Sequence, residues 1–269
     1  MIDGVVVAAL TPFDEQGALD ARRIPPYVDY LLDASVGGLM VGGTTGEFVT
    51  MTSDERIEAV GAFARAVAGR VPVIAHVGHA APAEACRLAA RAAEAGADAL
   101  TAITPYFHPV QPAAVEAYFR DVAAAVPTLP FHVYNYPEAS GTRIAPATFR
   151  GLLDVPNLAG VKLSVATFAE VEPYLDLLGK LTVMSGNDAL IVPFAEAGGT
   201  AVVSGNASVR PALLVDLFAA AQGGHTAAVE RLVAELDQLR ELTAAAPDRL
   251  KAALRGSGVD IGEARIRTV

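Results

Sequence analysis

Residues 38–68 read GLMVGGTTGEFVTMTSDERIEAVGAFARAVA, and this stretch holds the pattern that decides the fold. A short apolar run at 38–41 predicts a buried strand, and a break rich in glycine and threonine follows it. Residues 53–68 then show helical spacing, and Thr52 and Glu55 have the spacing of a capping box. The stretch therefore predicts one strand followed by one helix.

The same pattern occurs eight times along the chain. The expected strands are residues 5–10, 38–41, 71–76, 99–103, 131–135, 158–162, 181–185 and 201–204. The expected helices are residues 20–34, 53–68, 82–94, 112–125, 146–153, 168–178, 188–196 and 211–221, and prolines at 82, 112, 146 and 211 mark helix starts. Eight such units predict an α/β fold, a (β/α)8 TIM barrel, and no GxGxxG follows the first strand to suggest a doubly wound sheet.

The chain is expected to form a single domain overall. Residues 1–222 would form the barrel, and residues 223–269 a C-terminal helical extension, with helices at 226–245 and 247–254, packed on the barrel. A length of 269 residues, of which 52% are hydrophobic, is sufficient for one large core.

Charge and composition exclude several classes of function. The net charge of −10 repels nucleic acid and anionic lipid, and no stretch of lysine or arginine forms a basic stripe. The single cysteine, Cys86, cannot form an intrachain disulfide, and neither a targeting segment nor an apolar span of bilayer length is visible. We expect a cytoplasmic protein that acts on small molecules and binds neither nucleic acid nor a membrane.

Lys162 is the most informative residue of the expected catalytic rim, where the segments after the strands meet. The chain has three lysines among its twenty basic residues; Lys180 falls in a turn and Lys251 in the outer helical tail. Lys162 ends the sixth strand, where shielding from water favours the neutral amine that imine formation needs. A lysine paired with a rim carboxylate is the alternative, and its position alone does not decide.

Two more segments of the rim carry chemistry. Residues 42–47, GGTTGE, follow the second strand, and their small side chains let backbone N–H groups converge on an anion such as a carboxylate, although an ordinary turn is the alternative. Tyr134 ends the fifth strand and should border Lys162 on the neighbouring strand. Its phenol could transfer protons, or it could simply be part of the core.

The combined motifs resemble the pyruvate-dependent class I lyase superfamily of dihydrodipicolinate synthase, N-acetylneuraminate lyase and 2-keto-3-deoxygluconate aldolase. The resemblance covers nearly the whole chain. It is carried by Thr11-Pro12-Phe13, Gly43-Thr44-Thr45-Gly46-Glu47, Thr104-Pro105-Tyr106, Tyr134-Asn135-Tyr136-Pro137, Gly160-Val161-Lys162 and Ser185-Gly186-Asn187-Asp188.

The resemblance implies a Schiff-base-forming lyase or aldolase that makes or cleaves a C–C bond between pyruvate and an aldehyde. Lys162 would form the imine, Tyr134 would transfer protons, and Thr44 with Thr45 would hold the substrate carboxylate. No metal or organic cofactor is then required. The substrate-binding set would be completed by Gly43, Tyr106, Ser204 and Gly205, although residues 204–206 could instead cradle a phosphate.

Departures from the synthase pattern bear on the substrate. Dihydrodipicolinate synthases usually carry an arginine two residues after the proline of the tyrosine motif, where this chain has Ala139, and a second tyrosine where it has Phe107. A 4-hydroxy-2-oxo acid or a 2-keto-3-deoxy sugar acid is therefore expected as substrate. The synthase itself, a keto-deoxy sugar acid dehydratase and a non-catalytic 2-oxo acid sensor are the alternatives.

Weaker signals point the same way. The Ser140-Gly141 pair after the tyrosine motif resembles the keto-deoxy sugar acid aldolases, and residues 75–78 resemble the sialic acid lyases. Ser140 and His76 are therefore candidates for substrate contact, as is His79. The resemblance also implies a homo-oligomer, either a dimer or a tetramer.

Overall fold

Eight parallel strands pair in sequence order and close into a barrel, because β1 pairs with β8 as well as with β2. The computed structural model describes residues 2–267. Met1 of the expected barrel region (1–222) and residues 268–269 of the expected extension (223–269) therefore lie outside the described residues. The strands are β1 Gly4–Ala8, β2 Gly38–Val41, β3 Val73–His76, β4 Ala99–Ile103, β5 Phe131–Asn135, β6 Leu158–Leu163, β7 Thr182–Ser185 and β8 Ala201–Ser204. The predicted (β/α)8 barrel is confirmed.

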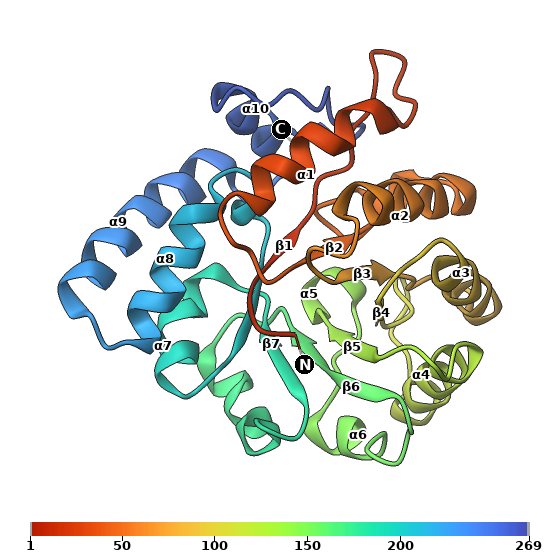
Figure 1. Ribbon diagram of the computed structural model, residues 1–269. Coiled ribbons are helices and arrows are strands. Elements are labelled where there is room, and N and C mark those ends of the chain that lie inside the picture. The colour runs from red at the N-terminus through yellow and green to blue at the C-terminus, as the bar shows by residue number, and fades with distance from the viewer. Residues whose placement is uncertain (1, 268–269) are drawn as a thin grey trace.

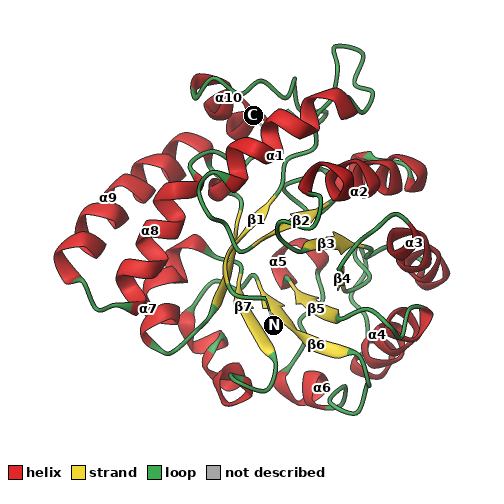
Figure 2. Ribbon diagram, viewed as in Figure 1, coloured by secondary structure: helices red, strands yellow, loops and turns green. Residues whose placement is uncertain are grey.

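Helices surround the strands on every side (Figure 1, Figure 2). They are α1 Ile24–Leu32, α2 Ser53–Val67, α3 Pro82–Glu94, α4 Pro112–Ala125, α5 Pro137–Ser140, α6 Pro146–Arg150, α7 Ile191–Glu196, α8 Pro211–Gln222, α9 Thr226–Thr243 and α10 Pro247–Gly256. The four prolines expected at helix starts each occupy the first position of a helix. The Thr52 capping box is formed as predicted.

The largest departure from the predicted helices lies between β6 and β7. Residues 168–178 were expected to form one α-helix, but they form two 3₁₀ segments, Phe168–Glu170 and Glu172–Leu177. Pro173 lacks the N–H that an α-helix would need there. Other helices are also shorter than predicted. A 3₁₀ turn, Ala21–Arg23, precedes α1, which ends at Leu32, and α6 ends at Arg150. A 3₁₀ turn, Asp188–Leu190, precedes α7, and α9 ends at Thr243. The short helix α5 was not predicted.

The barrel is packed on both faces of its strands. Val6, Met40, Ile74, Met184 and Val203 fill its interior as one buried cluster, and a larger cluster lies between the strands and the helices. Such two-sided burial explains why the strands read as continuous apolar runs. Within residues 2–267 no helix combines the length and apolarity needed to cross a bilayer.

The C-terminal helices lie outside the barrel. Helix α9 packs against α8, and α10 packs against α9 and against the 3₁₀ turn Asn206–Ser208. Beyond α10 the chain returns to the first unit and runs near α1 (Figure 1). Arg23 pairs there with Asp260, at 2.7 Å.

Candidate active site

A cavity of about 470 Å³ opens where the strands end. Lys162, Tyr134, Thr44, Thr45 and Gly205 line it, as the sequence predicted for a shared pocket. The remaining lining residues are Ala8, Tyr136, Glu138, Ser164, Val165, Ala166, Gly186, Asn187, Asp188, Val203, Asn206, Arg240, Ala244, Ala245 and Pro247. The last four belong to the C-terminal extension, which therefore forms one wall of the cavity.

Lys162 lies on β6 with only 6% of its surface exposed. Its Nζ lies 4.0 Å from the centroid of the Tyr134 ring and 3.7 Å from Met40 Sδ. Among the described residues none forms an ion pair with Lys162, so the alternative of a lysine held by a rim carboxylate finds no support.

Tyr134 is the register partner of Lys162, because β5 and β6 pair with these two residues opposite each other. The predicted neighbourhood of the two residues is confirmed. The phenol ring is 2% exposed and stacks on Tyr136 with 6.0 Å between centroids, while His76 meets its edge at 6.1 Å. Rings on two sides therefore fix the orientation of the phenol beside the amine.

The loop after β2 is closed by its own backbone. The N–H groups of Glu47 and Phe48 donate to the carbonyls of Thr44 and Gly43, at 3.0 and 3.3 Å. Thr44 is exposed and Thr45 half-buried, and both line the cavity, whereas Gly43 does not. Gly46 packs so tightly that a Cβ would lie 2.9 Å from the carbonyl oxygen of Ala9. The loop thus contributes two threonines to the cavity lining from a tightly packed turn.

Of the other predicted binding residues, some line the cavity and some do not. Gly205 lines the cavity, and a Cβ there would come within 3.2 Å of Thr45 Oγ1, so glycine keeps the two loops close. Ser204 is buried and its Oγ accepts the Ala207 N–H at 3.1 Å. Tyr106 is half-buried with its ring against Phe48, at 5.6 Å. Ser204 and Tyr106 do not belong to the cavity lining.

His76 and Ser140 lie outside the cavity lining, and their polar atoms contact the backbone. His76 is 2% exposed, with Nδ1 2.9 Å from the Gly42 carbonyl and Nε2 accepting the Ile103 N–H at 3.3 Å. Burial lowers the pKa of His76 well below its usual range, so the ring is neutral and supports the base of the loop. Ser140 Oγ donates within its own turn, to the carbonyls of Tyr136 or Thr142.

His79 does not join the cavity lining either. Its Nδ1 accepts the Ala81 N–H at 3.0 Å, and its ring meets the edge of Tyr106. The position of a histidine after a strand therefore did not indicate whether its ring reaches the cavity.

Several polar groups at the far side of the cavity were not predicted as site residues. Asp188 accepts a hydrogen bond from Asn206 Nδ2 at 2.7 Å, and Asn206 Oδ1 accepts one from Thr243 at 2.7 Å. Desolvation raises the pKa of Asp188. Arg240 reaches the cavity from α9, paired with Asp237 at 2.8 Å. Asp188 belongs to the Ser185-Gly186-Asn187-Asp188 motif of the family resemblance. No sequence motif marked Arg240 as a cavity residue, because it comes from α9, which is distant from that motif in the sequence.

Gly186 is a second residue whose importance appears only in the structure. A Cβ at this position would lie 2.8 Å from Lys162 Cε and 2.3 Å from Ser164 Oγ. The space that the lysine side chain occupies therefore depends on this glycine.

Within residues 2–267 no three His, Cys, Asp or Glu side chains gather as a metal-binding group.

Known proteins resemble this chain along its whole length. The dihydrodipicolinate synthetase family matches residues 1–267. A 4-hydroxy-tetrahydrodipicolinate synthase from Nitratidesulfovibrio vulgaris is 34% identical over 238 residues, which cover 88% of this chain and 81% of that protein.

Solved structures agree with this assignment. Dihydrodipicolinate synthase from Aquifex aeolicus superposes with a TM-score of 0.92 at 29% identity, covering 98% of this chain and 91% of that one. A prophage protein of the dihydrodipicolinic acid synthase family from E. coli K12, solved in complex with pyruvate, gives a TM-score of 0.91 at 27% identity, covering 100% and 93%.

Proposed function

The chain belongs to the dihydrodipicolinate synthetase family, and on that premise we propose that Lys162 forms a Schiff base with pyruvate or a related 2-oxo acid. The enzyme is a class I pyruvate-dependent aldolase or lyase. We further propose that it makes or cleaves the C–C bond of a 4-hydroxy-2-oxo acid or a 2-keto-3-deoxy sugar acid.

One observation carries the proposal. The amine of Lys162 is buried, forms no ion pair with a described residue, and lies over the Tyr134 ring at the wall of the 470 Å³ cavity. In the proposed scheme this amine attacks the carbonyl carbon of the 2-oxo acid, because it lies at the cavity wall and no carboxylate of a described residue holds it. A lysine kept for stability alone would be expected to have a carboxylate partner, as Lys251 has in Glu47.

The reaction follows from this arrangement. The amine adds to the C2 carbonyl of pyruvate, and loss of water gives a protonated imine. Removal of a C3 proton then gives an enamine, which attacks the aldehyde carbonyl to form the new C–C bond; hydrolysis releases the product and frees the lysine. Cleavage is the reverse. Tyr134 transfers the protons, and the imine is the electron sink, so the scheme requires neither a metal nor an organic cofactor.

The loop after β2 would bind the carboxylate of the 2-oxo acid. The hydroxyls of Thr44 and Thr45 are donors at the cavity wall, and the glycine-rich backbone lets N–H groups turn toward an anion. Gly205 keeps the facing loop close to Thr45. In this scheme Gly43, Tyr106 and Ser204 support the loops from behind, and His76 holds the loop base.

The far side of the cavity supports a hydroxylated second substrate. Asp188 and Asn206 offer acceptors and a donor suited to hydroxyl groups, and Arg240 adds a cation. Ala139 replaces the arginine that meets the second carboxylate in typical synthases. These features favour a sugar-acid substrate, as does the likeness of the tyrosine motif to the keto-deoxy sugar acid aldolases.

Reductive trapping tests the proposal. Borohydride with pyruvate should add one fixed mass to the peptide that contains Lys162, and Lys162→Ala should abolish both the adduct and turnover. Lys180→Ala, which removes an exposed lysine, is the matched control and should keep both. Absence of an adduct on the native chain would refute the mechanism, and reversible pyruvate binding without an adduct would point to a sensor.

A second candidate is 4-hydroxy-tetrahydrodipicolinate synthase, because the 34% identical relative from N. vulgaris carries that name. Ala139 and Phe107 argue against this function, because typical synthases carry an arginine and a second tyrosine at these two positions. An assay with pyruvate and aspartate semialdehyde decides: turnover above that with keto-deoxy sugar acids would make the synthase the function. Product analysis with the sugar acids would also reveal dehydration in place of cleavage.

A further inference from the structure

Glu47 ends the loop after β2 and has an unusual environment. Its side chain is fully buried, and its backbone adopts a left-handed conformation with φ 59°. Its Oε1 lies 3.0 Å from Lys251 Nζ, while Oε2 accepts the backbone N–H groups of Arg265 at 2.8 Å and Ile266 at 2.9 Å. These partners all come from the C-terminal extension.

Lys251, which the sequence placed in an outer helical tail, is also inside the molecule. Its side chain is 1% exposed, its Nζ donates to the Glu263 carbonyl at 2.9 Å, and it lies 4.4 Å from the centroid of the Phe13 ring. Burial lowers the pKa of Lys251, and the Glu47 carboxylate opposes that shift. The pair is therefore a fully desolvated charge pair, in which loss of either partner leaves an uncompensated charge.

Arg265 holds the other end of the same loop region. Its guanidinium pairs with Glu55 in the first turn of α2 and donates to the carbonyls of Thr50 at 2.8 Å and Gly17 at 2.7 Å. It also covers the Phe13 ring, at 4.1 Å. Arg265 thus contacts Glu47, Thr50 and Glu55, which lie along the segment that connects the Thr44–Thr45 loop to α2.

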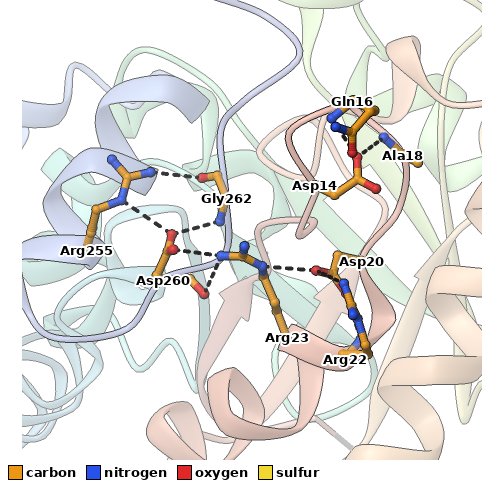
Figure 3. Close-up of polar contacts among 9 residues, drawn as sticks. All are labelled: Asp14, Gln16, Ala18, Asp20, Arg22, Arg23, Arg255, Asp260 and Gly262. Atoms are coloured by element: carbon orange, nitrogen blue, oxygen red, sulfur yellow. Dashed lines mark hydrogen bonds and ion pairs between the residues drawn. The ribbon is translucent and has the colours of Figure 1, made fainter.

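The C-terminal segment is itself tied to the first unit of the barrel, as Figure 3 shows. Asp260 accepts hydrogen bonds from Arg23 at 2.7 Å, from Arg255 at 3.3 Å and from the Gly262 N–H at 3.0 Å. At Gly262 a Cβ would lie 1.7 Å from the Phe13 carbonyl oxygen, and φ is +79°. Only glycine allows the segment to cross this closely.

We propose that residues 259–266, called here the C-terminal strap, position the Thr44–Thr45 loop for the substrate carboxylate, with Glu47 as the residue that joins strap to loop. A left-handed non-glycine residue with a buried charge costs free energy, so surrounding contacts must maintain it. Without the strap, Glu47 turns toward water, and Thr45, two residues away, loses its orientation. Glu47 is thus a positioning residue. The inference rests on the proposed function of the loop.

The test compares two carbonyl compounds in the borohydride assay. Pyruvate carries the carboxylate that the loop would bind, and methyl pyruvate does not. A chain that ends at Ala264 lacks both N–H donors to Glu47 Oε2 but retains Lys251. We expect the pyruvate concentration for half-maximal trapping to rise about tenfold or more, as for loss of a charged hydrogen bond. Trapping of methyl pyruvate should stay unchanged.

Arg120→Ala is the matched control, because it removes an exposed ion pair with Asp154 far from the loop and should change neither value. Circular dichroism and a thermal melt check that each variant is folded. If the truncated chain fails to fold, the double variant Glu47→Leu with Lys251→Met decides, because it removes the acceptor of both strap N–H groups and leaves no buried charge unpaired.

The outcomes separate the two hypotheses. No adduct on the native chain refutes the proposed function itself. An adduct on the native chain with an unchanged half-maximal pyruvate concentration in the folded variant overturns the strap inference alone. An equal loss for pyruvate and methyl pyruvate also overturns it, since that pattern indicates general damage to the site.

Discussion

Tyr134 and Lys162 face each other across the β5–β6 pair, with the lysine Nζ 4.0 Å from the centre of the phenol ring. The face of the ring packs against the amine, and the proposed mechanism assigns proton transfer to its hydroxyl. A substitution that removes only the hydroxyl distinguishes them.

Tyr134→Phe should keep the ring under the amine but remove the proton carrier. We expect kcat to fall 10²- to 10⁴-fold, the usual contribution of a positioned acid or base, with KM for the 2-oxo acid nearly unchanged. Steady-state kinetics measures both. Tyr136→Phe, on the ring stacked against Tyr134, is the control and should retain most activity. A large rise in KM with kcat preserved would assign Tyr134 to binding instead.

Gly186→Ala should disable the lysine without unfolding the barrel. The added Cβ would lie 2.8 Å from Lys162 Cε, so the side chain must move away from its place on the Tyr134 ring. We expect at least a tenfold loss of kcat and a smaller yield of trapped adduct. Gly256→Ala, where a Cβ meets no atom within 4 Å, is the control. Full activity in Gly186→Ala would show that the observed lysine position is not needed.

The buried histidine of β5 predicts how stability depends on pH. Desolvation lowers the pKa of His132 from 6.5 to about 4, so between these values the unfolded chain binds a proton that the folded chain does not. Stability should therefore fall as the pH falls from about 6.5 to about 4, by up to about 3 kcal/mol from this residue. Urea unfolding across that range should show a shallower pH dependence for His132→Asn. His225→Asn, at an exposed site, should match the native chain.

Phe107 makes the proposed homo-oligomer testable. It is 87% exposed, and its φ of 84° is strained for a bulky residue, which suggests that neighbouring contacts stabilise it in an assembly. Sedimentation of the native chain should give a dimer or a tetramer, and Phe107→Asp should weaken it. Leu153→Asp, at another exposed apolar residue, should not. A native chain that sediments as a monomer at all concentrations would contradict this prediction.

Local signals explain which features the sequence could predict. The eight strands are buried on both faces, and most of the helices begin at a proline or at a capping box, so both patterns lie within short windows. The neighbourhood of Tyr134 and Lys162 was predictable because equivalent ends of adjacent parallel strands meet. The 3₁₀ segments at 168–177 were missed although Pro173 was visible, because apolar spacing alone resembled a helix.

Side-chain direction and distant contacts escaped prediction. His76 ends β3, but its ring turns to the backbone of the neighbouring loop. Arg240 reaches the cavity from a helix outside the eight units, and Lys251 is buried against Glu47, which lies about two hundred residues earlier in the sequence. Such contacts depend on how the C-terminal helices pack on the barrel. No sequence pattern within the barrel or within the C-terminal extension predicts that packing.

The contact between Glu47 and the C-terminal strap joins residues that are synthesised at very different times. Glu47 leaves the ribosome early, whereas the Arg265 N–H that it requires is made 218 residues later. The early βα units can assemble while translation continues, but we expect the loop that they carry to stay unsatisfied until residues 265 and 266 emerge. We therefore expect a chain that ends before Arg265 to have Lys162 and Tyr134 in place and still to bind its 2-oxo acid poorly.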